Sequence, residues 1–173
     1  DFIRAMSQAW EQEESPAAKA ALTQVLVNSR MCAIGKRPIC QDTGIVNVLI
    51  SVGMDVRWDA ELSLEDMINE GVRRGYTHPD NVLRGSVLSD PDGLRANTKD
   101  NTPAVIHTKI VAGDTVEIEV AAKGGGSEAK AKFAMLNPSD SVVDWILSVI
   151  PSMGAGWCPP GILGVGIGGT PEK

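Results

Sequence analysis

Apolar positions near the start of the chain recur at the spacing of an amphipathic helix. Residues 2–13 and 16–30 are predicted as two such helices. Ser15 followed by Pro16 supplies an N-cap and a first-turn proline, which marks where the second helix begins. The apolar stripe of this second helix consists of Ala18, Leu22, Val25 and Leu26.

Two later segments also have a helical pattern. Ser63 precedes a segment over about 64–75 whose apolar residues fall on one face, so a capped amphipathic helix is predicted there. Ser139 is predicted to cap a last helix near 140–150, which ends before Pro151.

The middle of the chain alternates between strand-like and loop-like composition. Residues 45–53, IVNVLISVG, are rich in β-branched side chains and are predicted as a mostly buried strand. Residues 77–103 are dense in Asp, Asn, Pro and Gly, which predicts a long ordered loop of the kind that often carries function. A β-hairpin around an Ala-Gly-Asp turn is predicted over 104–126. The apolar face of its second strand, which we expect to be buried, consists of Val116, Ile118 and Val120.

Together these elements predict an α/β fold. N-terminal helices would pack with a small mixed sheet that contains the hairpin, and the chemical motifs would lie on loops at strand ends. No repeat or clear linker divides the sequence, so a single domain over 1–173 is predicted. Because the chain starts on Asp1 rather than Met, we expect it to be a piece of something longer.

Composition narrows the class of partner. The chain is 43% apolar and 22% charged, as in an ordinary water-soluble protein, and no apolar run is long enough to cross a membrane. The acidic start does not resemble a signal peptide, so a cytoplasmic protein is predicted. A net charge of −6 without a Lys/Arg run argues against nucleic acid, which leaves a small-molecule ligand as the expected partner.

The cysteines point away from a local metal-binding module. Cys32, Cys40 and Cys158 are odd in number and form no C-x2-C pair, so free thiols are expected and a self-contained zinc site is excluded. Any metal site must therefore be assembled from distant parts of the chain.

The segment PICQDTG places a thiol, an amide and a carboxylate next to one another just before the first strand. Cys40 is either a small buried residue before a polar turn, or a thiolate ligand or nucleophile with Gln41 and Asp42 at a strand mouth. The two histidines, His78 and His107, are better explained as structural residues than as the base that a nucleophile needs.

Two further features are candidates for binding an anion. Gly124, Gly125 and Gly126 form either a flexible turn or a run of unobstructed N–H groups that can cradle carboxylate or phosphate oxygens. Arg84 and Arg95 are the best cationic candidates in the loop region, because a guanidinium can grip a carboxylate with two hydrogen bonds.

The glycine-rich end of the chain matches a nucleotide-binding pattern only formally. Residues 164–169 satisfy G-x-G-x-x-G, but they follow a Pro-Pro pair and not the first strand of a Rossmann unit. Thr170 and the proline after it resemble the cap and first turn of a further helix.

The order of the motifs CQDTG, DNVLR, AKGGGSE and AGWCPPGILGVGIGGT resembles the class I, iron–sulfur-dependent fumarate hydratases and the related tartrate dehydratase alpha chains. The resemblance covers essentially the whole chain and corresponds to the N-terminal, or alpha, region of that family. It implies a part of a longer protein or one subunit of a two-subunit enzyme.

The resemblance implies a 4Fe–4S cluster that three cysteines hold, with one iron open to substrate. Cys40 and Cys158 match two of these ligands, whereas Cys32 is outside the ligand motifs and is expected to be structural. The third family cysteine is expected beyond Lys173, so the chain alone is expected to be inactive.

The resemblance also implies roles in the reversible hydration of fumarate to malate. Gln41 and Asp42 would touch substrate, and Asp42 would either transfer a proton or orient another group. Arg84 and the backbone of Gly124–Gly126 would bind the far carboxylate. The expected partners are a small dicarboxylate, the C-terminal part or beta subunit of the enzyme, and a second copy in a homodimer. Tartrate dehydratase is the nearer alternative, and a non-catalytic binding or assembly module is the more distant one.

Overall fold

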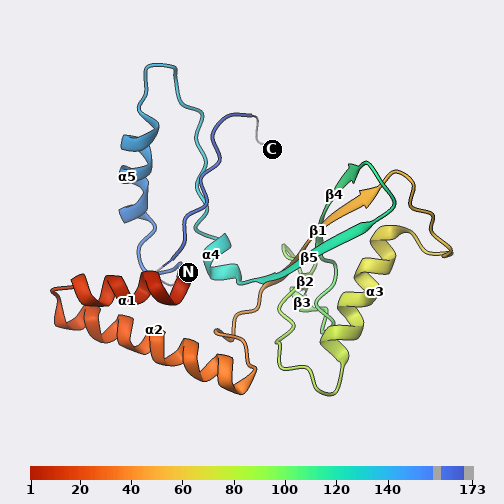
Figure 1. Ribbon diagram of the computed structural model, residues 1–173, viewed down its shortest axis with the longest axis horizontal. Helices are drawn as coiled ribbons and strands as arrows, with labels where there is room; N and C mark the ends of the chain where they lie inside the picture. Colours follow the sequence, from red (N-terminus) through yellow and green to blue (C-terminus); the bar gives the residue numbers. More distant parts are fainter. Residues whose placement is uncertain (158–160, 170–173) are drawn as a thin grey trace. The chain divides into compact units, whose positions relative to one another are not determined.

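The computed structural model describes residues 1–157 and 161–169 of the chain (Figure 1). The chain divides into two compact units, Asp1–Gly125 and Gly126–Lys173, and each is considered by itself. The helices and strands of the first unit are α1 (Phe2–Gln12), α2 (Pro16–Gly35), β1 (Ile45–Gly53), α3 (Leu64–Thr77), β2 (Leu88–Ser89), β3 (Ala96–Asn97), β4 (Val105–Val111) and β5 (Val116–Lys123). The short helix α4 (Gly125–Glu128) follows β5, and the second unit contains α5 (Val142–Ser152).

Helices α1 and α2 are the two N-terminal helices that the sequence predicts, and they pack as an antiparallel pair (Figure 1). Ser15 caps α2 by accepting a hydrogen bond of 3.4 Å from the Ala18 N–H. Trp10 joins the two helices through a 2.8 Å hydrogen bond from its Nε1 to Thr23 Oγ1. Helix α2 continues past the predicted end at residue 30 because no glycine or proline interrupts it before Gly35.

A three-stranded mixed sheet, in the order β4-β1-β5, forms the centre of the first unit. Strand β1 runs parallel to β4 and antiparallel to β5. A separate antiparallel pair, β2 and β3, lies within the segment predicted as a long loop. The α/β class with a small mixed sheet is therefore confirmed.

The predicted hairpin over 104–126 is wrong in its pairing. Both of its strands exist as β4 and β5, but β1 lies between them, and neither pairs with the other. The connection between them crosses the end of β1, where the N–H groups of Met54 and Asp55 donate to the carbonyls of Val111 and Gly113. Gly53 makes this crossing possible, because a Cβ atom there would lie 2.6 Å from the Gly113 carbonyl carbon.

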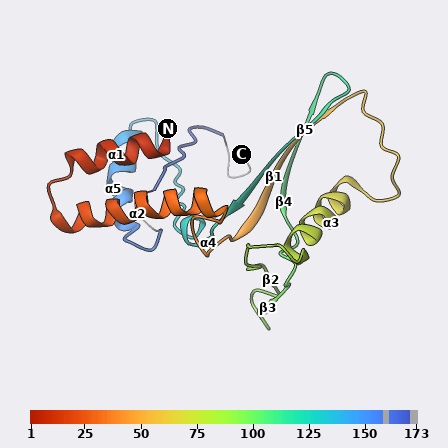
Figure 2. The same cartoon turned by 60° about the horizontal axis from the view of Figure 1, so that its bottom comes forward.

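The core lies on one face of the sheet, beneath α3 (Figure 2). The inward residues of β1 are all buried and form one cluster with Tyr76 of α3, and the partly buried Ile68 and Val72 pack against it. On the opposite face of β1, Ile45 and Leu49 are exposed, but five of the nine residues of the strand are buried, so the prediction of a mostly buried strand is confirmed. The buried residues of β1 are Val46, Val48, Ile50, Val52 and Gly53.

The prediction that β5 buries its apolar face is also wrong for this chain. Val120 and Ile118 pair with Val48 and Ile50, so they share the α3 face of the sheet. Their exposures are nevertheless 66% and 53%, because α3 covers β1 and leaves the side of β5 open. An apolar groove of about 360 Å³ runs between α3 and β5, with Tyr76 in its lining.

The second unit contains α5 and two irregular segments. Ser141 caps α5 by accepting from the Asp144 N–H at 3.2 Å, so the predicted cap at Ser139 is wrong. Asp140 instead closes a turn before the helix by accepting a 2.7 Å hydrogen bond from the Asn137 N–H. Helix α5 also continues through Pro151 to Ser152 and does not end before this proline.

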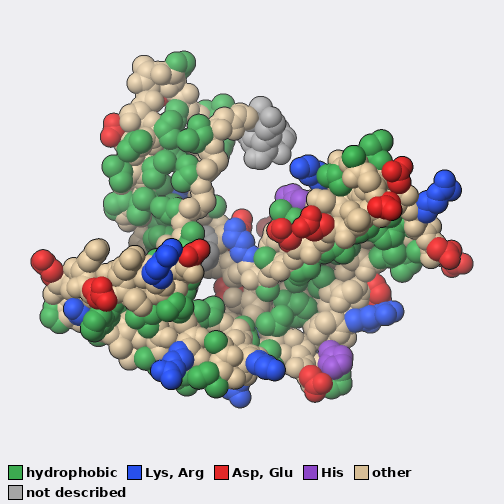
Figure 3. Space-filling model, viewed as in Figure 1, with side chains coloured by type: hydrophobic (Ala, Val, Ile, Leu, Met, Phe, Trp, Pro, Cys, Tyr) green, Lys and Arg blue, Asp and Glu red, His purple; other side chains and the backbone are tan. Residues whose placement is uncertain are grey.

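Hydrophobic side chains gather on the visible surface of α5 in Figure 3, and Val143 and Leu147 are among the exposed ones. Residues 161–169 have no helix or strand. Cys158 and the predicted helix start at Thr170 lie outside the described residues. In the described part of the chain, no helix has both the length and the apolar character needed to cross a membrane.

Candidate functional site

The CQDTG segment meets the end of β5 at the point where the central strand β1 begins. Ile45, the first residue of β1, pairs with Lys123, the last residue of β5. Gly44 adopts a left-handed conformation with φ +55°, and a Cβ atom there would lie 2.6 Å from the Lys123 carbonyl carbon. Only glycine fits this position without strain, so the close approach of the two segments depends on it.

Asp42 lies against the glycine run that follows β5. A Cβ atom on Gly124 would be 2.9 Å from the Asp42 carbonyl oxygen and 3.4 Å from its Oδ2. A Cβ atom on Gly125 would be 4.0 Å from the same Oδ2. The structure therefore brings Asp42, Gly124 and Gly125 together, and Gly126 belongs to the second unit.

The main chain of Arg84 is held beside the same loop. Thr43 Oγ1 donates a 2.6 Å hydrogen bond to the Arg84 carbonyl oxygen, and Ser86 Oγ donates to the Gly44 carbonyl at 3.4 Å. The Arg84 side chain is exposed. The cationic residue Arg84 therefore lies on a loop whose backbone is hydrogen-bonded to Thr43, the residue after Asp42.

Cys40 is exposed, and its Sγ lies 3.4 Å from Gln41 Oε1. The segment before it is anchored to α2, because Asn28 Nδ2 donates to the Ile39 carbonyl at 2.7 Å. Cys32 Sγ, which is half-buried on α2, donates to the Pro38 carbonyl at 3.3 Å. The two thiols therefore differ: the Cys32 thiol contacts a backbone carbonyl, whereas the Cys40 thiol is exposed to solvent.

Two buried polar residues at this site were not among the predicted site residues, although Thr43 lies within the CQDTG motif. Thr43 is 4% exposed, and Asn101 is completely buried. Asn101 bonds to the backbone on both sides of the junction, at Gly44 and at Ser86. The only local signal is that Asn101 stands in the turn-rich run KDNTP, where asparagine tolerates a positive φ.

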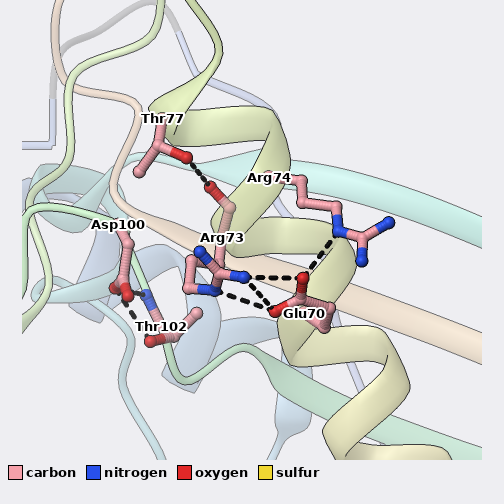
Figure 4. Close-up of polar contacts among 6 residues, drawn as sticks. All are labelled: Glu70, Arg73, Arg74, Thr77, Asp100 and Thr102. Carbon is pink, nitrogen blue, oxygen red and sulfur yellow. Dashed lines mark hydrogen bonds and ion pairs between the residues drawn. The ribbon is translucent and has the colours of Figure 1, made fainter.

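Figure 4 shows the polar contacts of Asp100, which precedes Asn101, and of Glu70 on α3. Asp100 accepts hydrogen bonds from the N–H and Oγ1 of Thr102 at 3.0 and 2.8 Å, and the backbone N–H bond lowers the pKa of this carboxyl. On α3, Glu70 accepts from Arg73 at 2.8 Å and from Arg74 at 2.6 Å. The Arg73 hydrogen bond is the main cause of a lowered Glu70 pKa.

The other candidates make their contacts elsewhere in the first unit. His78 is the C-cap of α3, and its Nδ1 accepts from the Asp80 N–H at 3.2 Å. His107 lies on β4 opposite Leu49, on the sheet face that α3 does not cover. Arg95 has φ +50°, and its Nε donates to the Pro91 carbonyl at 3.0 Å within the β2–β3 connection.

Among the described residues, Cys40 fits one ligand position of a metal cluster, but a complete set of cluster ligands is not present. Among residues 1–157 and 161–169, no group of three His, Cys, Asp or Glu side chains is placed to hold a metal ion. Cys40 has the exposed thiol that a ligand requires, and Cys158 lies outside the described residues.

Comparison with known proteins identifies the family. The family model for fumarate hydratase (fumerase) matches residues 1–173. The chain belongs to the fumarate hydratase family. This membership confirms the resemblance that the order of the motifs indicates.

The relatives in this family carry two kinds of name. A "Putative L(+)-tartrate dehydratase subunit alpha" from Methanocaldococcus jannaschii is 30% identical over 99% of the chain, which covers 62% of that protein. The anaerobic class I fumarate hydratase of Escherichia coli K12 is 33% identical over 92% of the chain and 29% of its own length. The L(+)-tartrate dehydratase alpha subunit of the same strain is 26% identical over 99% of the chain and 57% of its own length. The chain thus spans less than two thirds of each of these relatives.

Proposed function

We propose that this chain supplies one side of the active site of an iron–sulfur hydro-lyase that converts fumarate and malate into each other. The remaining part of the site would come from a C-terminal part of the same protein or from a beta subunit. The alpha-subunit names of two relatives support the second arrangement. A homodimer and a cytoplasmic location stay predictions.

One observation supports the proposal: the chemistry of a hydro-lyase site needs a cluster ligand, a carboxylate and groups that bind an anion, and residues of these kinds lie on connected segments of the first unit. Cys40 is exposed two residues before Asp42, and Asp42 lies against Gly124. The backbone of Arg84 is bonded to the residue after Asp42. Cys40, Asp42, Gly124 and the backbone of Arg84 therefore belong to segments that meet where β1 begins and β5 ends, which supports the proposal.

A 4Fe–4S cluster bound by Cys40 and Cys158, with a third ligand from outside the chain, would supply a Lewis-acidic iron to polarise substrate oxygen. The residues of the chain would do the rest. Asp42 would accept, deliver or orient the proton that is exchanged at the substrate carbon. Arg84 and the N–H groups of Gly124–Gly126 would bind a carboxylate of the dianion and hold it before the reaction begins.

Fumarate and malate are proposed as the first substrates, and tartrate is the second candidate. Fumarate hydration adds a hydroxyl group and a proton to adjacent carbons, and tartrate dehydration removes the same two groups from a more oxidised diacid. A specific observation keeps tartrate in view: the relatives matched over 99% of the chain are named as tartrate dehydratase alpha subunits.

The test is turnover of fumarate, malate and tartrate by the complete enzyme, reconstituted without oxygen and compared with two variants. Asp42→Asn should lower turnover by roughly 100-fold or more, because it removes a proton-transfer or orienting group. Asp59→Asn makes the same substitution on an exposed loop residue and should leave turnover unchanged. Wild-type turnover by Asp42→Asn would overturn the role of Asp42.

Two further outcomes separate the alternatives. Turnover of tartrate without turnover of fumarate would select the second candidate substrate. No turnover of any of the three acids by cluster-loaded enzyme would overturn the proposed function and favour a binding or assembly role.

A further inference from the structure

Asn101 is the only fully buried polar side chain among the described residues, and it lies where three segments meet. Its exposure is 0%, and its backbone has φ +59°. A buried amide is costly unless its donors and acceptors are used, so its partners show what holds it there. All three of these partners are backbone groups.

The partners of Asn101 belong to two different loops. Its Nδ2 donates to the Gly44 carbonyl at 3.0 Å. Its Oδ1 accepts from the N–H groups of Ser86 and Val87, at 2.7 and 3.0 Å. One side chain therefore joins the end of the CQDTG segment to the residues that directly follow Arg84 and Gly85.

Thr43 makes a second connection between the same two loops. Its side chain is nearly buried, and its Oγ1 donates to the Arg84 carbonyl at 2.6 Å. The two connections are adjacent along the chain, because Thr43 precedes Gly44 directly. Residues 84–87 have no regular structure. They are also held from the side of β3, where the Thr98 N–H donates to the Val87 carbonyl and Asn97 Nδ2 donates to the Gly85 carbonyl, both at 2.9 Å.

We propose that Asn101 and Thr43 are positioning residues that set the separation of Asp42 and Arg84. This inference rests on the proposed function, which assigns both charged residues to one dicarboxylate. Arg84 would bind one carboxylate while Asp42 acts at the carbon that exchanges a proton, and this carboxylate and this carbon lie a fixed distance apart in the substrate. The two residues must therefore also be held at a fixed distance. Neither Asn101 nor Thr43 needs to touch the substrate for this role.

The test uses four variants of the complete enzyme. Asn101→Gly removes the side-chain bonds and keeps a residue that accepts the positive φ. Thr43→Val removes the hydroxyl at nearly constant shape, and Thr43→Ser restores it. Val52→Ala is the stability control, because Val52 is buried near the opposite end of β1 from Gly44.

The expected result is a loss of roughly 10- to 100-fold in kcat/KM for Asn101→Gly and Thr43→Val, since small displacements of positioned groups are costly in rate. Thr43→Ser should keep kcat/KM within a few-fold of the wild type, because serine retains the hydroxyl that donates the hydrogen bond. Val52→Ala should unfold at lower urea but keep its kcat/KM. In Asn101→Gly, hydrogen exchange should become faster at the amides of Ser86 and Val87.

Two results would overturn the proposal. In the first, Asn101→Gly and Thr43→Val have the same kcat/KM as the stability control Val52→Ala. In the second, Thr43→Ser is as impaired as Thr43→Val. If Asn101→Gly does not fold, the two Thr43 variants still decide the matter.

Failure of the proposed function gives a different pattern. The wild type would then turn over none of the acids, while hydrogen exchange would still report whether the Asn101 side chain holds the amides of Ser86 and Val87. Unchanged exchange at Ser86 and Val87 in Asn101→Gly overturns the connection itself, and faster exchange supports it.

Discussion

Replacing Gly44 with alanine should damage both the stability of the fold and the candidate site. Gly44 has φ +55°, and a Cβ atom there would lie 2.6 Å from the carbonyl carbon of Lys123 and 2.7 Å from Gly124 Cα. Both neighbours are backbone atoms of the paired strand end, so neither can rotate out of the way.

The cost follows from two contributions. A left-handed conformation costs a residue with a Cβ atom about 1–2 kcal/mol. Ordinary contact begins at 3.4 Å, so the Lys123 carbonyl carbon would have to move by 0.8 Å and its oxygen, the nearest atom, by more, which disturbs the β1–β5 pairing at Ile45. Together we expect a loss of roughly 3–5 kcal/mol in the free energy of unfolding, and a large loss of turnover with it.

Gly71 provides a control with the same chemical change. It lies within α3, and a Cβ atom there would meet no atom within 4 Å. Gly71→Ala should therefore stabilise the protein by about 0.5–1 kcal/mol, because alanine is the better helix former. Urea unfolding followed by far-UV circular dichroism measures both variants. A Gly44→Ala protein within about 1 kcal/mol of the wild type would refute the steric reasoning, since left-handed strain alone predicts at least that much.

Three smaller predictions concern the rest of the chain. Ile50→Ala should cost about 2–4 kcal/mol in urea unfolding, because Ile50 is 1% exposed in the core. Ser141→Ala should cost about 1 kcal/mol as a lost helix cap, and Ser139→Ala should cost little. The backbone N–H of Thr102 lowers the pKa of Asp100, so this carboxylate stabilises the fold above its unfolded pKa of about 3.9 and loses that contribution as pH falls through the lower folded value. Asp100→Asn should flatten this acid part of the stability profile, and an unchanged slope would contradict it.

Local signals predicted the ends of elements well where one side chain decides them. Ser15 and Ser63 both cap the helices that they were predicted to cap. Ser139 failed because Ser141 offers the same chemistry two residues later, and the Asn137–Asp140 turn selects the later start. The strands β4 and β5 were located but paired wrongly, because alternation along a strand does not show which strand lies beside it.

The residues of the candidate site also fall into those that the sequence identified and one that it missed. The wording of the motifs drew attention to Asp42, Arg84 and Gly124, and the structure places Asp42 against Gly124 and bonds the Arg84 backbone to the next residue. Asn101 was missed because its side chain bonds to a carbonyl 57 residues away, and no local pattern marks such a partner. Buried polar groups that join distant loops become visible only once the fold is known.

The most direct test of the central claim compares two cysteine variants of the complete enzyme, reconstituted with iron and sulfide without oxygen. Cys40→Ser removes the exposed thiol of the CQDTG segment, and Cys32→Ser removes the thiol that contacts the Pro38 carbonyl. The account predicts that Cys32→Ser keeps the visible absorbance of the cluster and the turnover of malate, whereas Cys40→Ser loses both. A Cys40→Ser enzyme with full cluster absorbance and wild-type turnover would contradict it.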